Sequence, residues 1–363
     1  MKSGPTPRLT VALLAALAVG VIGLAGCSGR AARPAELGVT WLQLRAGEFQ
    51  PAADPSSAAA VPRRPWTVQS RVADFAFLGD TLYCAVNGSG LAAFGRDPSG
   101  APTFTYHDDP PIFGHRTITT LIPRQGSLAA HVYFNALLND ARQQDLAIAG
   151  ICLVSFVPRQ TDYTFLIPPF QKKNPDWEAV GFTAESENSF DFEWKYTDAS
   201  ETRFAYTRYH ADTNAEEMVD RSTFLAALGV PAIEGPDVPS TLAAFFSTCL
   251  ADMPTLGPSA SVQFALRSRE NPVKRSYRSR KDSESSVSVP LFEEQGKLFA
   301  LLPDGRVLIA ETASPPRELS LPPLPPGFRY TDFVKWGSSL VVSWEEIAFT
   351  DVARAGLLVY TLR

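Results

Sequence analysis

One short pattern occurs twice in this sequence, and it constrains the fold more than any other feature. Residues 71–82, RVADFAFLGDTL, align without a gap on residues 329–340, RYTDFVKWGSSL. Arg, Asp, Phe, Gly and Leu occupy the same places in both copies. Each copy predicts an apolar strand, a glycine turn and a second apolar strand, because glycine adopts the backbone angles that tight hairpins require. We therefore expect the chain to be built from repeated β-hairpins.

Similar hairpin signals occur between the two copies. Looser versions of the pattern lie at 121–128 and 291–298, and Pro303-Asp304-Gly305 separates two apolar segments. Aromatic side chains alternate through 190–196, as they do on a half-buried strand. The hairpin units begin near residues 71, 117, 178, 287 and 329.

This spacing resembles that of β-propellers, whose blades have about 40–50 residues and four strands each. The resemblance implies an all-β fold over residues 66–363, a β-propeller of six or seven irregular blades. A different multi-sheet all-β fold is the alternative. An apolar segment at 36–49 is also expected to be a strand, and the C-terminal segment 356–362 is its expected partner.

The β pattern is interrupted at about 216–256, where two short helices are expected at 222–229 and 240–253. In the second helix, apolar residues recur at helical spacing on one face: Leu242, Phe245, Phe246, Cys249 and Leu250. We expect this insertion to pack on the propeller, although a lid or partner-docking arm is an open alternative.

The N-terminus has the three parts of an export signal. Lys2 and Arg8 precede an uncharged apolar run, and Leu24-Ala25-Gly26-Cys27 ends it. This tetrad resembles the lipobox of bacterial lipoproteins. The resemblance implies that residues 1–26 are removed and that Cys27 carries the lipid, followed by a tether with one strand and a Pro- and Ala-rich linker to residue 65. A plain signal peptide and an uncleaved transmembrane anchor are the alternatives, but the apolar run is short for a membrane span.

A lipoprotein of this kind lies on the extracytoplasmic side of the cell envelope. Ser28 follows the cysteine, and because aspartate there favours the inner membrane in enterobacterial relatives, an outer-membrane destination is allowed. The sequence leaves the choice of membrane open. The formal net charge of −5 disfavours nucleic acid as a partner.

Three cysteines remain beside Cys27, namely Cys84, Cys152 and Cys249. Their number and spacing predict no disulfide framework and no metal site, so at most one disulfide is expected. We expect no metal and no cofactor. No strong catalytic motif occurs in the sequence.

The best polar cluster consists of His107, Asp108, Asp109 and His115. Imidazole and carboxylate groups together can bind a metal or relay a proton, although a solvated loop explains the same residues. Residues 212–216 alternate oxygen ligands but lack the later glycine and glutamate of a calcium loop, so a turn is expected. Trp177, Trp194, Trp336 and Trp344 are expected in the core, with a sugar- or peptide-binding floor as the alternative.

One segment is strongly basic. It contains Arg267, Arg269, Lys274, Arg275, Arg278, Arg280 and Lys281. Proline and serines within the segment predict an exposed loop. Its charges suit contact with an anionic surface, such as lipid headgroups, envelope glycan or an acidic protein, and a merely solvated loop is the alternative.

These observations favour a non-enzymatic binding or scaffold protein of the cell envelope. An envelope hydrolase or lyase acting on glycan or peptide is the second interpretation, and it relies on the histidine cluster. A structural surface protein is the third. The position of the histidine cluster relative to a central pocket discriminates the first two.

The lipobox generates a direct prediction. Cys27→Ser should abolish labelling by a palmitate analogue and block signal processing, because the resemblance implies that lipid is transferred to this thiol before the signal is cleaved and the freed amine is acylated. Ser28→Ala is the matched control and should label normally. Normal labelling and maturation of the Cys27→Ser protein would show that the anchor assignment is wrong.

Overall fold

The computed structural model describes residues 38–45, 48–58, 61–62, 71–86, 90–108, 117–133, 151–160, 163–223, 238–253, 261–269, 274–278, 286–311, 314–347 and 352–362. The chain divides into two compact units, Met1–Val39 and Thr40–Arg363. The sheets belong to the second unit, apart from Val39, the first residue of the N-terminal strand. Among the described residues, no helix has the length and apolar character needed to cross a membrane.

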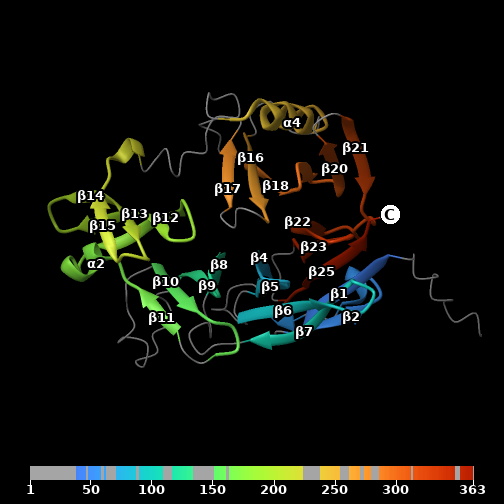
Figure 1. Cartoon of the computed structure of the whole chain (residues 1–363), viewed down its shortest axis with the longest axis horizontal. Helices are drawn as coiled ribbons and strands as arrows, with labels where there is room; N and C mark the ends of the chain where they lie inside the picture. The colour runs from blue at the N-terminus through green and yellow to red at the C-terminus, as the bar shows by residue number, and fades with distance from the viewer. Residues whose placement is uncertain are drawn as a thin grey trace, which may run out of the picture. The chain divides into compact units, whose positions relative to one another are not determined.

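Three consecutive four-stranded sheets follow one another along the chain (Figure 1). The first contains β4 (Val72–Leu78), β5 (Thr81–Val86), β6 (Gly90–Arg96) and β7 (Pro102–Asp108). The second contains β8 (Thr117–Arg124), β9 (Ser127–Tyr133), β10 (Ile151–Phe156) and β11 (Tyr163–Leu166). The third contains β12 (Glu178–Ala184), β13 (Ser189–Thr197), β14 (Thr202–His210) and β15 (Ala215–Met218), and the short α2 (Pro169–Lys173) precedes it. Within each sheet, sequential strands are antiparallel neighbours, as hairpin turns require.

The fourth sheet has six strands in the order β17-β16-β18-β19-β20-β21. Their bounds are β16 (Ser261–Ser268), β17 (Arg275–Arg278), β18 (Ser286–Glu294), β19 (Lys297–Leu301), β20 (Arg306–Glu311) and β21 (Ser314–Ser320). β16 runs parallel to β18, so the β16–β17 hairpin extends the edge of this sheet. The helix α4 (Ser240–Ala251) packs on the sheet through its predicted apolar face, with Phe246 stacked on Phe264 at 4.4 Å between ring centroids. The insertion therefore packs on the β structure as expected, while the other expected helix lies almost entirely outside the described residues.

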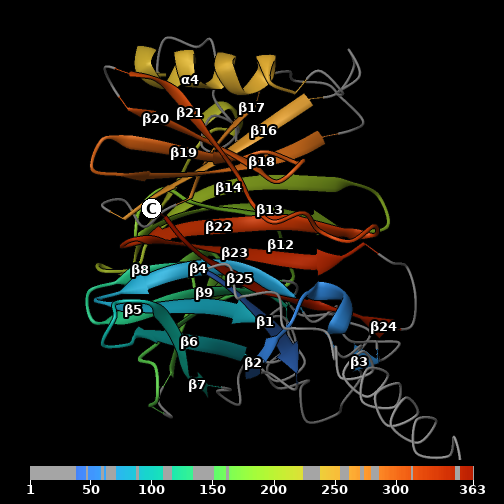
Figure 2. The same cartoon turned by 90° about the vertical axis from the view of Figure 1, so that its right-hand side faces the viewer.

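The fifth sheet joins the two ends of the second unit (Figure 2). Its strand order is β2-β1-β25-β23-β22. The bounds are β1 (Val39–Arg45), β2 (Glu48–Ala52), β22 (Phe328–Trp336), β23 (Ser339–Glu346) and β25 (Ala355–Thr361). A separate short pair consists of β3 (Val61–Pro62) and β24 (Val352–Ala353). A 3-10 turn lies at Pro55–Ser57. The N-terminal strand thus lies beside the C-terminal strand, which confirms the expected pairing. The sheet structure consequently begins at Val39, earlier than the boundary expected at residue 66.

The expected all-β, propeller-type architecture with a helical insertion is confirmed. The predicted hairpin starts agree with β4, β8, β12, β18 and β22. The number of blades differs, because the described residues form five sheets of four or more strands, not six or seven. The extra unit expected between residues 178 and 287 is absent from the described part of that segment, since β16 and β17 join β18 in the fourth sheet.

The core lies between neighbouring sheets. In the second sheet, Leu121, Ala130 and Val154 pack toward the first sheet, whereas Ile122 and Leu153 pack toward the third. Both faces of such a sheet are buried, so its strands are apolar on both sides. Trp194, Trp336 and Trp344 are fully buried, as expected for core residues, and Trp177 is partly buried.

The repeated pattern marks two equivalent strands. Gly79 and Gly337 both turn the chain with φ of +60°, and Phe75 and Phe333 are both buried. The strand register also shifts at the same place in each copy, just before Asp74 and just before Asp332. Because such bulges redirect side chains, the repeat gives both aspartates the same unusual position.

The junction of the two chain ends yields a stability prediction. A Cβ atom added at Gly356 in β25 would lie 2.0 Å from the Leu42 carbonyl oxygen of β1 and 2.5 Å from the Trp344 ring. Gly356→Ala should therefore separate β1 from β25 and lower the free energy of unfolding by about 3 kcal/mol, the upper end of the usual cost of overpacking. Urea unfolding and limited proteolysis of residues 39–52 measure both effects.

Gly79→Ala is the control for this prediction. The space around a Cβ at Gly79 is open, so only the positive φ opposes the alanine, at a cost of about 1–2 kcal/mol. Equal destabilisation by the two variants, or intact protection of residues 39–52 in Gly356→Ala, would show that this contact does not hold the junction.

Candidate functional site

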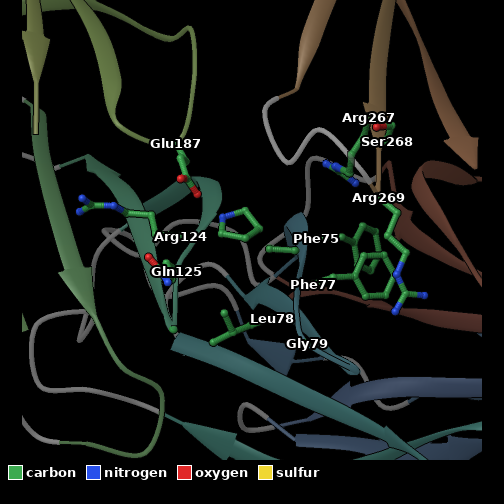
Figure 3. A pocket seen from close by; sticks show the side chains of 13 residues that line it. Phe75, Phe77, Leu78, Gly79, Arg124, Gln125, Glu187, Arg267, Ser268 and Arg269 are labelled. Atoms are coloured by element: carbon green, nitrogen blue, oxygen red, sulfur yellow. The ribbon is translucent and has the colours of Figure 1, made fainter. Parts of the chain in front are cut away.

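A cavity of about 350 Å³ lies where hairpin turns and strand ends from four sheets meet (Figure 3). β4 contributes its last residues and the turn at Gly79, and β8 contributes the turn into β9. The turn before β13 and the end of β16 complete the lining. We call this cavity the central pocket. Its lining residues are Phe75, Ala76, Phe77, Leu78, Gly79, Pro123, Arg124, Gln125, Gly126, Glu187, Arg267, Ser268 and Arg269.

One wall of the central pocket is aromatic. Phe77 packs edge-on against Trp336, at 6.0 Å between centroids, and against Phe292 at 6.4 Å. The Arg269 guanidinium lies over the Phe77 ring, 5.0 Å from its centroid. Neighbouring sheets thus fix the ring, and Arg269 brings a positive charge to its face.

Beneath this wall lies a buried ion-pair cluster. The Arg267 guanidinium on β16 donates through Nη2 to Asp74 on β4 and to Asp332 Oδ2 on β22, the latter at 3.1 Å. The Lys274 ammonium lies 3.5 Å from Asp332 Oδ2. Asp74 Oδ2 also accepts the backbone N–H of Leu121 on β8 at 2.8 Å. The cluster therefore joins four sheets through the two aspartates of the repeated pattern.

Electrostatics favour the ionised forms of Asp332 and Arg267. Burial alone raises the pKa of Asp332, but Arg267, Lys274 and the Phe333 N–H outweigh it, so the pKa lies below its ordinary value. Burial lowers the pKa of Arg267, and the charges of Asp332 and Asp74 more than compensate, so the pKa is raised. Each ion is stable in the interior only because its partners are present.

Arg124 and Glu187 line the opposite side of the pocket. Arg124 donates to Asn188 Oδ1 from Nε at 3.1 Å and from Nη2 at 2.6 Å, and to Ser155 Oγ from Nη1 at 3.4 Å. These partners are neutral. Glu187 lies in the same turn as Asn188, and in Figure 3 its carboxylate points toward the pocket.

The structure divides the basic segment in a way that its sequence did not predict. Arg267 is buried, and Arg269 and Lys274 pair with carboxylates. Residues 275–278 form β17, so the interpretation of the whole segment as one exposed loop is wrong. The reason is that Asp74, Asp80 and Asp332, which neutralise these charges, come from distant parts of the chain. Arg275 is exposed, the side chain of Arg278 is not described, and Arg280 and Lys281 lie outside the described residues.

Of the predicted histidine cluster, the structure places His107, which is not among the residues that line the central pocket. His107 lies on β7, which is at the opposite edge of its sheet from β4. Asp108 ends β7, while Asp109 and His115 lie outside the described residues. Residues 211–214 form a turn. In the described ranges, no three His, Cys, Asp or Glu side chains are grouped to hold a metal ion.

Two of the three remaining cysteines have described side chains. Cys84 and Cys249 are buried free thiols, and burial raises the pKa of both, that of Cys249 to about 12. The side chain of Cys152 is not described. The lipobox and Cys27 lie outside the described residues, so lipid attachment stays a prediction.

The sequence pointed to two basic residues of the pocket, Arg267 and Arg269, but not to Arg124 or to the pocket itself. Phe75, Phe77 and Asp74 were recognised only as parts of a repeated hairpin. Asp74 and Phe75 recur as Asp332 and Phe333, and this repeated carboxylate beside a buried aromatic residue was the available signal. Phe77 does not recur, because Lys335 takes its place in the second copy. Nothing in the local sequence distinguished Arg124 or Glu187 from ordinary turn residues.

The chain belongs to a family described as a family of unknown function (DUF8086), whose model matches residues 33–363. No curated protein matches the sequence. The solved structure of the polysaccharide lyase Uly1 is similar at 7% identity and a TM-score of 0.37, over 89% of this chain and 99% of that chain. YCF48 bound to D1 peptide has 8% identity and a TM-score of 0.30, over 84% and 95%. BamB from Moraxella catarrhalis has 10% identity and a TM-score of 0.27, over 88% and 81%.

The buried cluster predicts a specific stability defect. Arg267→Met leaves Asp74 and Asp332 buried without their main counter-charge, so it should lower the free energy of unfolding at pH 7 by about 3–5 kcal/mol. Arg269→Met, two residues away and partly exposed, should cost less than about 1 kcal/mol.

The pH dependence of the free energy of unfolding should also have the opposite sign in Arg267→Met and in the wild type. In the wild type the pKa of Asp332 is depressed, so its contribution is present at neutral pH and is lost as the pH falls through that pKa. In Arg267→Met the buried carboxylates favour protonation, so the variant should be more stable at pH 5 than at pH 7. Urea unfolding at both pH values measures this, and a variant that behaves like Arg269→Met would contradict the assigned role.

Proposed function

We propose that this protein is a lipid-anchored, non-enzymatic binding protein of the bacterial cell envelope, and that its ligand occupies the central pocket. The lipobox supports the location, and the pocket supports the activity. The proposal assigns the two roles to separate parts of the chain. Cys27 holds the protein at a membrane, and the β domain presents the site.

The observation that carries the proposal is the way the pocket is built. Four sheets contribute to the lining, and the side chains beneath and beside it are held by partners, as the Arg267 cluster and the Arg124–Asn188 pair illustrate. A largely preformed pocket with an apolar wall and a few placed polar groups is typical of ligand sites. Side chains locked by neighbouring elements lose little freedom when a ligand binds.

The enzymatic alternative finds no support at this pocket. That interpretation relied on the histidine cluster, and His107 lies on the outermost strand of its sheet and not in the pocket lining. The aromatic and guanidinium groups that do line the pocket suit recognition. We therefore favour binding over hydrolysis.

Photo-crosslinking from inside the pocket tests the proposal. Gln125 lines the pocket and is exposed, so a benzoylphenylalanine at this position should be tolerated. In the full-length, membrane-anchored protein, ultraviolet irradiation of cells should attach a discrete ligand or partner that is then identified by mass spectrometry. Benzoylphenylalanine in place of Arg317, an exposed residue on β21, is the control.

The proposal predicts adducts from position 125 that position 317 does not form. Filling the pocket with Leu78→Trp should remove them, and circular dichroism should show that the variant is folded. Identical adducts from both positions, or no adduct from position 125, would contradict a binding role for this pocket.

A further inference from the structure

We infer that the central pocket binds a carboxylate attached to an apolar body. The carboxylate is placed against the guanidinium groups of Arg267 and Arg269, and the body against Phe75 and Phe77. This inference rests on the proposed function and names the ligand class of the same site.

The lining carries more positive than negative charge. Arg124, Arg267 and Arg269 line the pocket, and Glu187 is the one acidic residue among the described lining residues. Arg267 is balanced within its cluster by Asp74 and Asp332, which Lys274 also shares. The charges that decide the potential at the pocket are therefore those of the other two arginines and Glu187.

Neither of these two arginines is strongly neutralised. In the described residues, no carboxylate lies within 4.0 Å of Arg124, whose hydrogen-bond acceptors are an amide and a hydroxyl. Arg269 lies 3.3 Å from Asp80, whose side chain is 95% exposed, and 4.0 Å from Glu294. Glu294 also pairs with Lys335. Since exposed pairs contribute little, both arginines remain available to an anion.

A buried donor in the pocket has no acceptor. Arg267 Nη1 is buried, and no hydrogen-bond partner for it occurs among the described residues. An unsatisfied buried donor costs about 1–3 kcal/mol, more if it is charged, so this nitrogen favours any acceptor that reaches it. In Figure 3 the Arg267 guanidinium extends from β16 toward the pocket. An oxygen that enters past Phe75 would complete its hydrogen bonds.

The wall specifies what the anion is attached to. Phe75 and Phe77 lie on one face of β4, with the Arg267 guanidinium 5.8 Å from the Phe75 centroid and the Arg269 guanidinium 5.0 Å from the Phe77 centroid, and Leu78 adds an apolar side chain on the other face. A guanidinium binds a planar carboxylate through two parallel hydrogen bonds, whereas Glu187 disfavours an anion with two charges such as phosphate. A single carboxylate next to an aromatic or branched apolar group matches the positive charge, the unsatisfied donor and the apolar wall. Such a group exists both as a free acyl amino acid and as the last residue of a peptide.

Calorimetric titration of the full chain in detergent tests this ligand class. The probes are N-acetyl-L-phenylalanine, the tripeptide Ala-Ala-Phe, and the C-terminal amide of each. Each acid and its amide differ only in the charge of the terminal group. We expect at least one acid to bind ten-fold or more tightly than its own amide. The tighter of the two acids distinguishes a free small molecule from a peptide end.

Substitution of Arg269 assigns the preference to the pocket. Arg269→Met retains a stem that covers Phe77 but removes the charge, so it should weaken binding of the preferred acid about ten-fold and leave amide binding unchanged. Arg317→Met is the matched control and should change neither. Arg267 is left intact in this test, because its loss is expected to unfold the cluster.

Two results would overturn the inference. Acids and amides could bind equally or not at all, or Arg269→Met could retain the full preference for the acid. Crosslinking from position 125 is independent of the charge of the ligand. Adducts there together with equal binding of acid and amide would refute the ligand class and leave the binding function in place.

Discussion

The buried guanidinium of Arg267 is the interaction on which the arrangement of sheets depends. It lies between two aspartates that are more than two hundred residues apart in sequence, and one of these also accepts a backbone N–H from the second sheet. A charge in such a position is costly unless every partner is in place. Any arrangement that moves one of these strands away leaves an ion unpaired in the interior, so the cluster selects one packing of four sheets.

The remaining structure supports that junction. The N-terminal strand β1 lies beside β25, so the first and last strands of the second unit share one sheet. Between sheets, the core is built from residues that face alternate sides of each strand, as Leu121 and Ile122 do. These contacts supply most of the apolar burial, and the ion cluster supplies specificity among the ways in which similar sheets could pack.

The central pocket follows from the same architecture. Hairpin turns from successive sheets meet beside the cluster, so the pocket receives one aromatic wall from β4 and charged groups from β8, β16 and the turn before β13. Arg267 contributes both to the sheet junction and to the pocket, because Nη2 holds the sheets together and Nη1 has no acceptor within the described part of the chain. A residue that stabilises the fold and also lines the site links binding to the integrity of the sheet junction.

The sequence by itself determined the local elements of this protein. The alternation at 190–196, the glycine turns and the apolar face of 240–251 predicted strands, hairpins and a helix, because these patterns follow from backbone geometry within a few residues. The strand at 39–45 and its pairing with 355–361 were also predictable, since few other apolar segments at the two ends could pair. Only the tertiary structure decided that β16 and β17 join the fourth sheet, that Arg267 is buried and that Phe77, Arg124 and Glu187 line one pocket. The physical reason is that a charged side chain can be buried only where partners neutralise it. The folded sheets, and not the neighbouring sequence, bring these partners to Arg267 and Arg269.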